Sequence, residues 1–344
     1  MRSLALALAV FPVLAVTAVA ASGCAPSSID EAERKGNVAW LDQNGTPAAV
    51  EALGRLADKD PKARSALEAR STFDAEAFRA AWAAVRRGAS WGTTLFHGAL
   101  LDPKRADLAA SAMDRHDPHL PAFAADLEQA LVRLSATIQN FNVASTLASL
   151  GAPGHDAVVR RLTDPSTRGA MCRGVASPDA SHESRDALLT APVADRNSDD
   201  CVDAVVALAA ADEPVLVWLG EQGEPGLLGA AGKEEILPCP KLHFAWTKAL
   251  AKRTVDVYPA LTVPLGYAMK RCAAEMDGVV ADAITHLPAT HSFVVEAIDP
   301  YDGYGKALHA TCAALPLVAS GGRDTPVIRE RANDALNHGC KAPG

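Results

Sequence analysis

The sequence predicts an all-helical protein, and three observations support this fold class. Alanine, the strongest helix former, makes up roughly a fifth of the 344 residues, whereas aromatic residues make up only 5%. Apolar side chains recur at helical spacing along most of the chain, and strand signals are few. A capping residue followed by proline repeatedly stands where such an apolar pattern begins. We therefore expect close-packed helices around a core with few aromatic side chains.

The first 23 residues have the layout of an export signal. Arg2 precedes an apolar run from Leu4 to Ala20, and small residues follow the run. The run contains Pro12 and is about 17 residues long, which is the lower limit for a helix that spans a bilayer core of ~30 Å. A cleaved signal peptide over residues 1–23 is therefore favoured over a permanent membrane helix.

The leader ends in Ala21-Ser22-Gly23-Cys24, and this segment resembles the lipobox of bacterial lipoproteins. The resemblance covers the leader alone and implies cleavage before Cys24, lipidation of its thiol and anchorage to a membrane. Two or three acyl chains anchor durably, because each buried methylene contributes ~0.8 kcal/mol. Ala25 further resembles lipoproteins sorted outward, which implies the cell envelope, and the outer membrane if the cell has two. The alternative is an ordinary secretory signal, with Cys24 in a disulfide.

Six further cysteines all lie in the second half of the chain. Unpaired thiols are unfavourable in an oxidising compartment, so we expect three disulfides rather than six free thiols. Many pairings are compatible with the sequence, and we predict that neighbours pair. No two have the spacing of a zinc or redox motif, and we expect no metal or cofactor. The predicted pairs are Cys172 with Cys201, Cys239 with Cys272, and Cys312 with Cys340.

The charge of the chain argues against two classes of partner. Acidic residues number 41 and basic residues 33, for a formal net charge of -8. Binding to nucleic acid or to anionic lipid requires a basic face, and the sequence has no basic stripe. We therefore expect no nucleic-acid partner, and contact with the membrane only through the N-terminal lipid.

The chain after the leader divides into a short tether and one helical domain. Residues 24–36 are polar and charged, and we expect them to be flexible, whereas residues 37–344 form the domain. Helical periodicity begins after Thr46-Pro47 and recurs to the end of the chain. The apolar faces that define the first predicted helices are Val50, Leu53, Leu56 and Ala57; Phe78, Trp82 and Val85; Phe123, Leu127, Leu131, Leu134 and Ile138; and Val143, Leu147 and Leu150, with Gly151 as a cap.

One capping element recurs along the domain with the pattern D-P-x-x-R-x-A-[LM]. It occupies residues 60–67 and 164–171, residues 325–336 keep most of it, and Asp102-Pro103 is a poorer instance. The aspartate or threonine accepts hydrogen bonds from first-turn amides, and the proline presets the backbone angle. Small alanines then permit a close approach to the preceding helix. The element therefore predicts the starts of helices that pack in series.

These residues resemble HEAT-like helical repeats, in which paired helices of ~40 residues stack into a solenoid. Recognisable units lie near residues 46–70, 154–172 and 315–338. The resemblance implies a HEAT-like α-solenoid, stapled by disulfides in its second half. An irregular stack of helical hairpins is the alternative. Two breaks rich in polar residues, glycine and proline, residues 173–200 and 221–240, are expected to be long loops.

Several residue groups are candidates for chemistry, although each has a plain structural explanation. His116, Asp117 and His119 could ligate a metal, but a capping turn accounts for them equally well. Residues 299–305 have the composition of a calcium loop without its alternating ligands. We expect His286 and His291 to be solvated or capping, and the tryptophans to pack in the core. These tryptophans are Trp40, Trp82, Trp91, Trp218 and Trp246.

Common catalytic motifs are missing from the sequence, including nucleotide-binding loops, the serine elbow and the zinc-protease helix. A triad assembled from distant residues is still possible. We expect a membrane-anchored, non-catalytic binding or scaffold protein of the envelope that contacts another envelope protein, because stacked helix pairs present extended surfaces. The alternatives are an envelope hydrolase or metal-dependent enzyme that uses the loop at 116–119 or 299–305, and a purely structural component.

Overall fold

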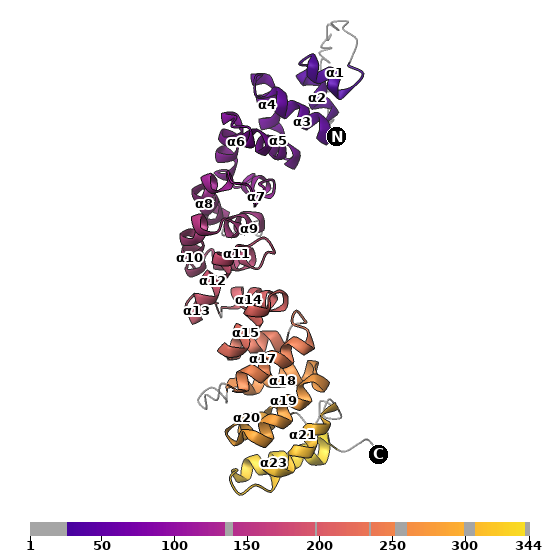
Figure 1. The fold of residues 1–344 in the computed structure, drawn as a ribbon, viewed down its shortest axis with the longest axis vertical. Coiled ribbons are helices and arrows are strands. Elements are labelled where there is room, and N and C mark those ends of the chain that lie inside the picture. Colours follow the sequence, from indigo (N-terminus) through magenta and orange to yellow (C-terminus); the bar gives the residue numbers. More distant parts are fainter. Residues whose placement is uncertain are drawn as a thin grey trace, which may run out of the picture.

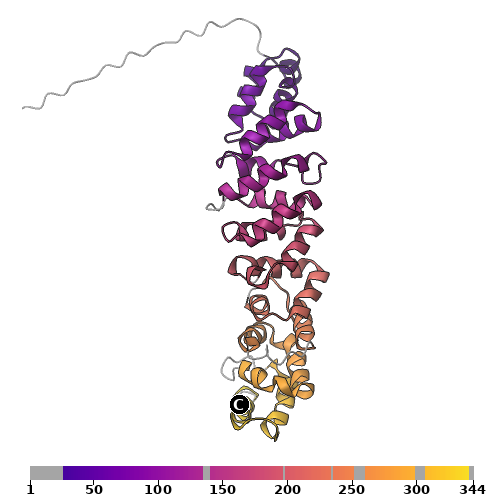
Figure 2. The same cartoon turned by 90° about the vertical axis from the view of Figure 1, so that its left-hand side faces the viewer.

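The fold is an elongated, curved stack of helix pairs (Figures 1 and 2). The computed structural model describes residues 26–134, 140–196, 198–233, 235–251, 260–298 and 307–340. These residues form helices and turns and contain no β-strand, which confirms the predicted all-α class. The two ends of the described chain lie at opposite ends of the stack (Figure 1).

The helices form two layers, because most helices pack on their partner in the pair and on the equivalent helix of the next pair. In Figure 1 the stack bends so that α7, α9 and α11 lie on the inner side and α8 and α10 on the outer side. The first layer consists of α1 (Ile29–Arg34), α3 (Pro47–Leu56), α5 (Ala75–Arg86), α7 (Ala106–Ser111), α9 (Phe141–Ser149), α11 (Arg168–Val175), α14 (Asp199–Ala211), α16 (Pro225–Lys233), α18 (Thr262–Arg271), α20 (His291–Ala297) and α23 (Pro326–Asp334).

The second layer follows the same order along the axis. Short helical turns complete the connections: η1 (Leu120–Phe123), η2 (Ala152–Gly154), α13 (Val193–Arg196), η4 (Pro288–Thr290), α22 (Pro316–Ala319) and η6 (Ala335–Gly339). The second-layer helices are α2 (Val38–Asn44), α4 (Pro61–Arg70), α6 (Ser90–Leu100), α8 (Ala124–Leu134), α10 (His155–Thr163), α12 (His182–Thr190), α15 (Glu213–Gln222), α17 (Cys239–Ala251), α19 (Ala273–His286) and α21 (His309–Ala314).

The chain is already folded where a flexible tether was expected. Ser28 caps α1 by accepting a hydrogen bond from the amide of Glu31, and Ala32 is fully buried within the first helix pairs. The prediction of a tether over residues 24–36 is therefore wrong from Ile29 onward.

The terminal helices α1 and α23 are rich in charged residues, as expected where the outer faces of a solenoid meet water.

The predicted apolar faces are buried where the structure describes them. Ile138 lies outside the described residues, and Leu56 is partly buried, while the other members of these faces are at most 8% exposed. Four aromatic rings from α5, α6 and η1 form a cluster, with ring centroids 5.3 to 5.8 Å apart. Tilted and edge-on pairs at such separations stabilise a core beyond simple burial. The four rings are Phe78, Trp82, Phe96 and Phe123.

The capping element joins two successive helices. Asp60 accepts a hydrogen bond from the amide of Lys62 at 2.8 Å, and Pro61 is the first residue of α4, as predicted. Arg64 donates through Nε to the carbonyl oxygen of Ala57 at 2.6 Å, at the end of α3. The last carbonyl groups of a helix lack partners within the helix. A cation near them also interacts favourably with the negative end of the helix dipole. The arginine of the element therefore caps the helix before it.

The second copy of the element departs from the prediction in one respect. Asp164 accepts from the amide of Ser166 at 2.9 Å, but α11 begins only at Arg168, so the aspartate lies in a turn rather than at a helix start. Arg168 donates to the carbonyl oxygens of Leu162 and Thr163 at 3.0 and 3.2 Å. The arginine therefore has the same role as Arg64, although the helix begins later.

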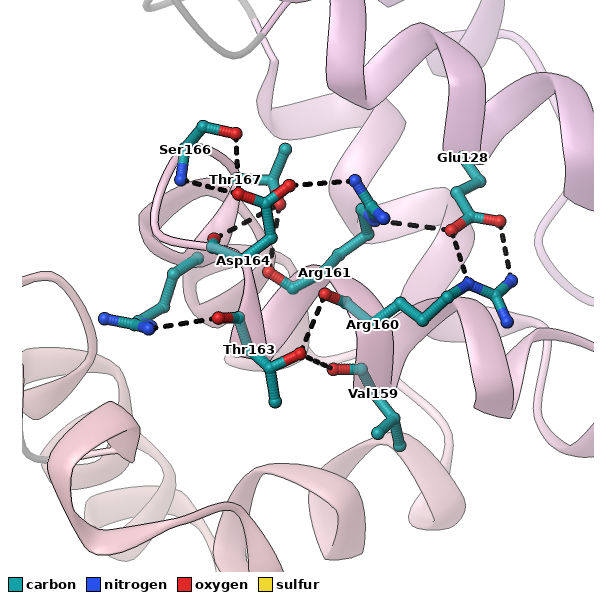
Figure 3. A network of polar contacts seen from close by, with 9 residues as sticks. Glu128, Val159, Arg160, Arg161, Thr163, Asp164, Ser166 and Thr167 are labelled. Atoms are coloured by element: carbon teal, nitrogen blue, oxygen red, sulfur yellow. Dashed lines mark hydrogen bonds and ion pairs between the residues drawn. The ribbon is translucent and has the colours of Figure 1, made fainter.

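Figure 3 shows how this turn is connected to the preceding helix pair. The carboxylate of Glu128 on α8 accepts from Nη2 of Arg160 at 2.8 Å and pairs with Arg161 at 3.3 Å, both on α10. Arg161 in turn contacts Asp164 at 3.0 Å. Charged side chains therefore bind one pair to the next along the second layer.

The repeat is shorter than the resemblance implied. Arg55 of α3 donates a hydrogen bond to Glu33 of α1, 22 positions away. Other side-chain hydrogen bonds between successive pairs join residues 27 to 36 positions apart, for example Arg185 with Asp212 and Thr146 with Ala110. The expected unit of ~40 residues is therefore too long for this stack. The two predicted loops are also largely helical, because α12 and α13 lie within residues 173–200, and parts of α15 and α16 lie within residues 221–240.

The three disulfides have the predicted pairing. Cys172–Cys201, Cys239–Cys272 and Cys312–Cys340 join residues 29, 33 and 28 positions apart, with Cα atoms separated by 5.2 to 5.6 Å. Their sequence separations match those of the hydrogen bonds between successive pairs. Each disulfide therefore links neighbouring repeats and lies in the second half of the stack.

Candidate functional site

The candidate metal ligands at residues 116–119 form a capping turn. Asp117 is buried and accepts a hydrogen bond from the amide of His119 at 2.9 Å, and the Nδ1 atom of the same histidine lies 2.7 Å from its carboxylate. His116 is exposed, and its amide is bound by Asp114 instead. Within the described ranges, no three histidine, cysteine or acidic side chains gather in a way that could hold a metal. The residues order the turn before α8.

The environment of Asp117 keeps its carboxylate charged. Burial raises the pKa of Asp117, but the hydrogen bonds from His119 and the nearby charge of Arg86 outweigh burial, so the pKa lies below its usual range. A carboxylate stabilised as an anion in this way suits capping and ion pairing, because a general acid needs the opposite shift.

The two histidines around Pro288 have different environments. His286 is exposed at the end of α19, with Nδ1 2.7 Å from Asp282. His291 is buried, with its side chain 8% exposed, so it is not solvated, but it caps the last turn of α19, in agreement with the capping alternative. Its Nδ1 lies 3.0 Å from Asp324, and its Nε2 donates to the carbonyl oxygen of Ile284 at 2.8 Å. His291 therefore ties α19 and α20 to the turn before α23.

The tryptophans only partly follow the expectation of core packing. Trp82 and Trp246 are at most 2% exposed. Trp40, Trp91 and Trp218 are partly buried at the edges of the core.

Residues 299–305 and Cys24 lie outside the described residues, so the calcium-loop and lipidation hypotheses are not tested by the geometry.

The candidate site is a cleft between α4 and α6, which we call the α4–α6 cleft. It has a volume of about 340 Å³, which is at the lower end of the range for small-ligand sites. The two helices make almost no direct contact, whereas the next second-layer helices, α6 and α8, pack together. The lining residues are Arg64, Glu68, Ser90, Trp91, Thr94, Leu95, Gly98 and Arg105.

Trp91 has a fixed position in this cleft. Its indole Nε1 donates to Asp58 at 2.9 Å, and Asp58 is also bound by Arg87 at 3.1 Å. Burial raises the pKa of Asp58, but the hydrogen bonds from Arg87 and Trp91 and the charge of Arg64 outweigh it, so the pKa is lowered. The carboxylate is therefore ionised at neutral pH, where it holds the ring strongly.

A second cleft lies between α17 and α19 and has a volume of about 370 Å³. Apolar side chains line much of it, and polar side chains, two of them histidines, complete the lining. His243 has Nδ1 2.7 Å from the carbonyl oxygen of Glu275, so this nitrogen carries the proton and donates it. The lining residues are His243, Thr247, Leu250, Ala251, Gly278, Val279, Asp282, Ala283, His286 and Leu287.

Sequence reasoning found neither cleft. Each combines side chains from two helices that lie about one repeat apart in the chain, and their proximity depends on the repeat length. The only local signal at the α4–α6 cleft is Trp91 at the start of a polar helical turn, Ser90-Trp91-Gly92-Thr93-Thr94. A partly buried tryptophan in such a polar turn indicates a binding surface only weakly.

Comparison with known proteins assigns no family to the chain. No protein-family model matches the sequence, and no curated protein matches it. Among the helices that the structure describes, none is long and apolar enough to cross a membrane. The three disulfides indicate an extracytoplasmic protein, because such bonds persist in oxidising compartments.

Proposed function

We propose that this protein is a lipoprotein of the bacterial cell envelope that binds another envelope protein through its helical-repeat surface. The observation that carries the proposal is the stack itself, a curved series of helix pairs with an extended surface (Figure 1). Proteins built this way commonly act by binding, because every repeat adds to one continuous face. The lipobox-like segment that ends in Cys24 supports the anchor.

The roles of the charged side chains also favour binding over catalysis. Glu128, Arg168 and Asp195 each join neighbouring helix pairs, and arginines of the capping element satisfy helix ends. In these contacts the charged groups stabilise the packing of the helices. The candidate loop at 116–119, on which an enzyme hypothesis rested, is a capping turn.

Exposed apolar side chains on the first layer are suitable contacts for a protein partner. Val263 and Tyr267 lie one turn apart on α18 and are 60% and 42% exposed, and Val327 on α23 is 58% exposed. Tyrosine is enriched among the residues that dominate binding energy at protein interfaces. We therefore place the partner contact on the first layer, with Tyr267 within it.

Photo-crosslinking in intact cells tests this placement. A photoreactive residue at position 267 should capture one specific protein, whereas the same residue at Thr285, exposed on the second-layer helix α19, should not. Equal capture from both positions, or no specific product from position 267, would contradict the proposal. Binding of the soluble domain to the captured protein should also weaken by tenfold or more in Tyr267→Ala, as for an interface hot spot.

The anchor has a separate test. In cells that express Cys24→Ser, the protein should lose its acyl chains and be released or retain its leader, since the thiol is the predicted attachment point. Mass spectrometry of the membrane fraction measures both outcomes. Membrane retention of an unacylated Cys24→Ser protein that has lost its leader would refute the anchor without affecting the binding surface.

A further inference from the structure

The α4–α6 cleft contains charged groups that the architecture leaves partly unused. Arg64 donates through Nε to Ala57 and through Nη2 to the carbonyl oxygen of Asp58 at 3.0 Å, while its Nη1 has no hydrogen-bond partner among the described residues. The carboxylate of Glu68, one turn further along α4, forms no ion pair or hydrogen bond within the described ranges. The cation and the anion are therefore both available to a ligand.

The charges alternate along the cleft. Arg105 is ion-paired through Nε with Asp102 at 2.9 Å, and its Nη1 donates one hydrogen to the hydroxyl of Ser71 at 3.3 Å at the end of α4, which leaves the second Nη1 hydrogen for a ligand. Positions 64, 68 and 71 lie on one face of a helix, and they span about 10 Å at 1.5 Å per residue. Among the side chains that line the cleft, the order of charge is positive, negative and positive. A complementary ligand has a positive group between two negative groups.

The other wall of the cleft is α6, and it offers an aromatic surface and space. Trp91 packs against both groups of buried apolar residues and is held by Asp58, so little freedom is lost when a ligand covers it. Gly98 has no atom within 4 Å of the position that a Cβ would occupy, which leaves room beside α6. An aliphatic chain that carries the central positive group can lie against the indole ring.

We propose that the α4–α6 cleft binds a short peptide segment in which an amino group lies between two carboxylates. The carboxylates are recognised by Arg64 and Arg105, the amino group by Glu68, and the aliphatic part of the basic side chain by Trp91. This site is separate from the first-layer surface assigned to the partner, and it does not depend on the anchor.

The test uses the purified full-length protein and two blocked peptides of opposite charge order, Asp-Gly-Lys-Gly-Asp and Lys-Gly-Asp-Gly-Lys. Alternate residues of an extended peptide lie on one side, and its five residues span the charged groups of the cleft. The first peptide should shift the indole NMR signal of Trp91, which Trp91→Phe identifies, and should bind at least tenfold more tightly than the second. Equal binding of both peptides, or no shift with either, would overturn the proposal.

A charge reversal with a matched control completes the experiment. Glu68→Lys should weaken binding of Asp-Gly-Lys-Gly-Asp by about tenfold or more and favour Asp-Gly-Asp-Gly-Asp instead, because all three cleft charges become positive. Glu221→Lys makes the same charge change at an exposed position of α15 outside the cleft, and should leave binding unchanged. An equal effect of the two substitutions would show that net charge, and not the cleft, governs binding.

Discussion

Ion pairs join successive repeats in both halves of the stack, but only the second half has disulfides at the same spacing. In the first half, ion pairs connect residues about one repeat apart, such as Arg70 with Asp42 and Arg160 with Glu128. In the second half, ion pairs continue at this spacing, such as Arg185 with Asp212 and Arg331 with Glu296, and three disulfides are added to them. The comparison teaches that the geometry of the repeat, rather than one type of bond, determines where repeats are joined.

The largest expected effect comes from reduction of the disulfides. Each disulfide closes a loop of about 30 residues in the unfolded chain and stabilises the fold by about 3 to 4 kcal/mol. Reduction and alkylation should therefore lower the protection of amide hydrogens in residues 168–340, as measured by hydrogen exchange. Residues 47–134 should keep their protection. Equal loss in both halves would show that the stack unfolds as one unit.

The next effect concerns the joint between the halves. A Cβ atom at Gly174 on α11 would lie 2.6 to 2.8 Å from atoms of Ala144 on α9. Gly174→Ala should therefore reduce the free energy of unfolding by about 1 to 3 kcal/mol, because backbones must separate. Gly278→Ala is the control, since open space surrounds that position on α19. It should stabilise α19 by up to about 1 kcal/mol. Urea denaturation measures both, and a neutral Gly174→Ala would contradict the tight packing.

Two aspartates that cap a helix of the next repeat allow a direct comparison. Asp107 accepts from the amides of Asn142 and Val143 at 2.9 and 3.2 Å, and Asp277 accepts from those of Ala310 and Thr311 at 2.8 and 2.7 Å. Replacement of either by alanine should cost about 1 to 2 kcal/mol, as for other lost caps.

The two variants should differ in how hydrogen exchange of the capped helix responds to reduction of the disulfides. Cys312 holds α21 independently of its cap, so hydrogen exchange in α21 of Asp277→Ala should increase most after reduction. Exchange in α9 of Asp107→Ala should be the same before and after reduction. An effect of reduction on α9 would mean that the disulfides stabilise the first half as well.

The smallest effect concerns the ion pairs of the first half. The hydrogen bond from Arg160 lowers the pKa of Glu128 despite its partial burial, and the charge of Arg161 adds to the shift. A lowered pKa means that the pair stabilises the fold above the ordinary pKa of glutamate, and that this contribution disappears as the pH falls through the lowered value. Glu128→Gln should therefore cost less than about 1 kcal/mol at pH 7 and nothing at pH 2. Urea titrations at both pH values measure the difference, and a cost that persists at low pH would exclude the ion pair as its cause.

Local patterns in the sequence predicted much of the fold. The apolar faces of α3, α5, α8 and α9 were recognisable from their spacing, because a helix buries side chains every three or four residues. The predicted pairing of neighbouring cysteines was also confirmed, although the sequence alone allowed other pairings. The helices within residues 173–200 and 221–240 were missed, because short helices with polar residues, glycine and proline resemble loops when only local sequence is considered.

The sequence by itself determined the helical class and the helix starts marked by Asp60 and Thr325, because each depends on nearby residues. Only the tertiary structure decided the length of the repeat, the burial of His291 and the two clefts. These features depend on the distance and rotation between stacked helices, which arise from side chains packing across the stack and leave no local pattern.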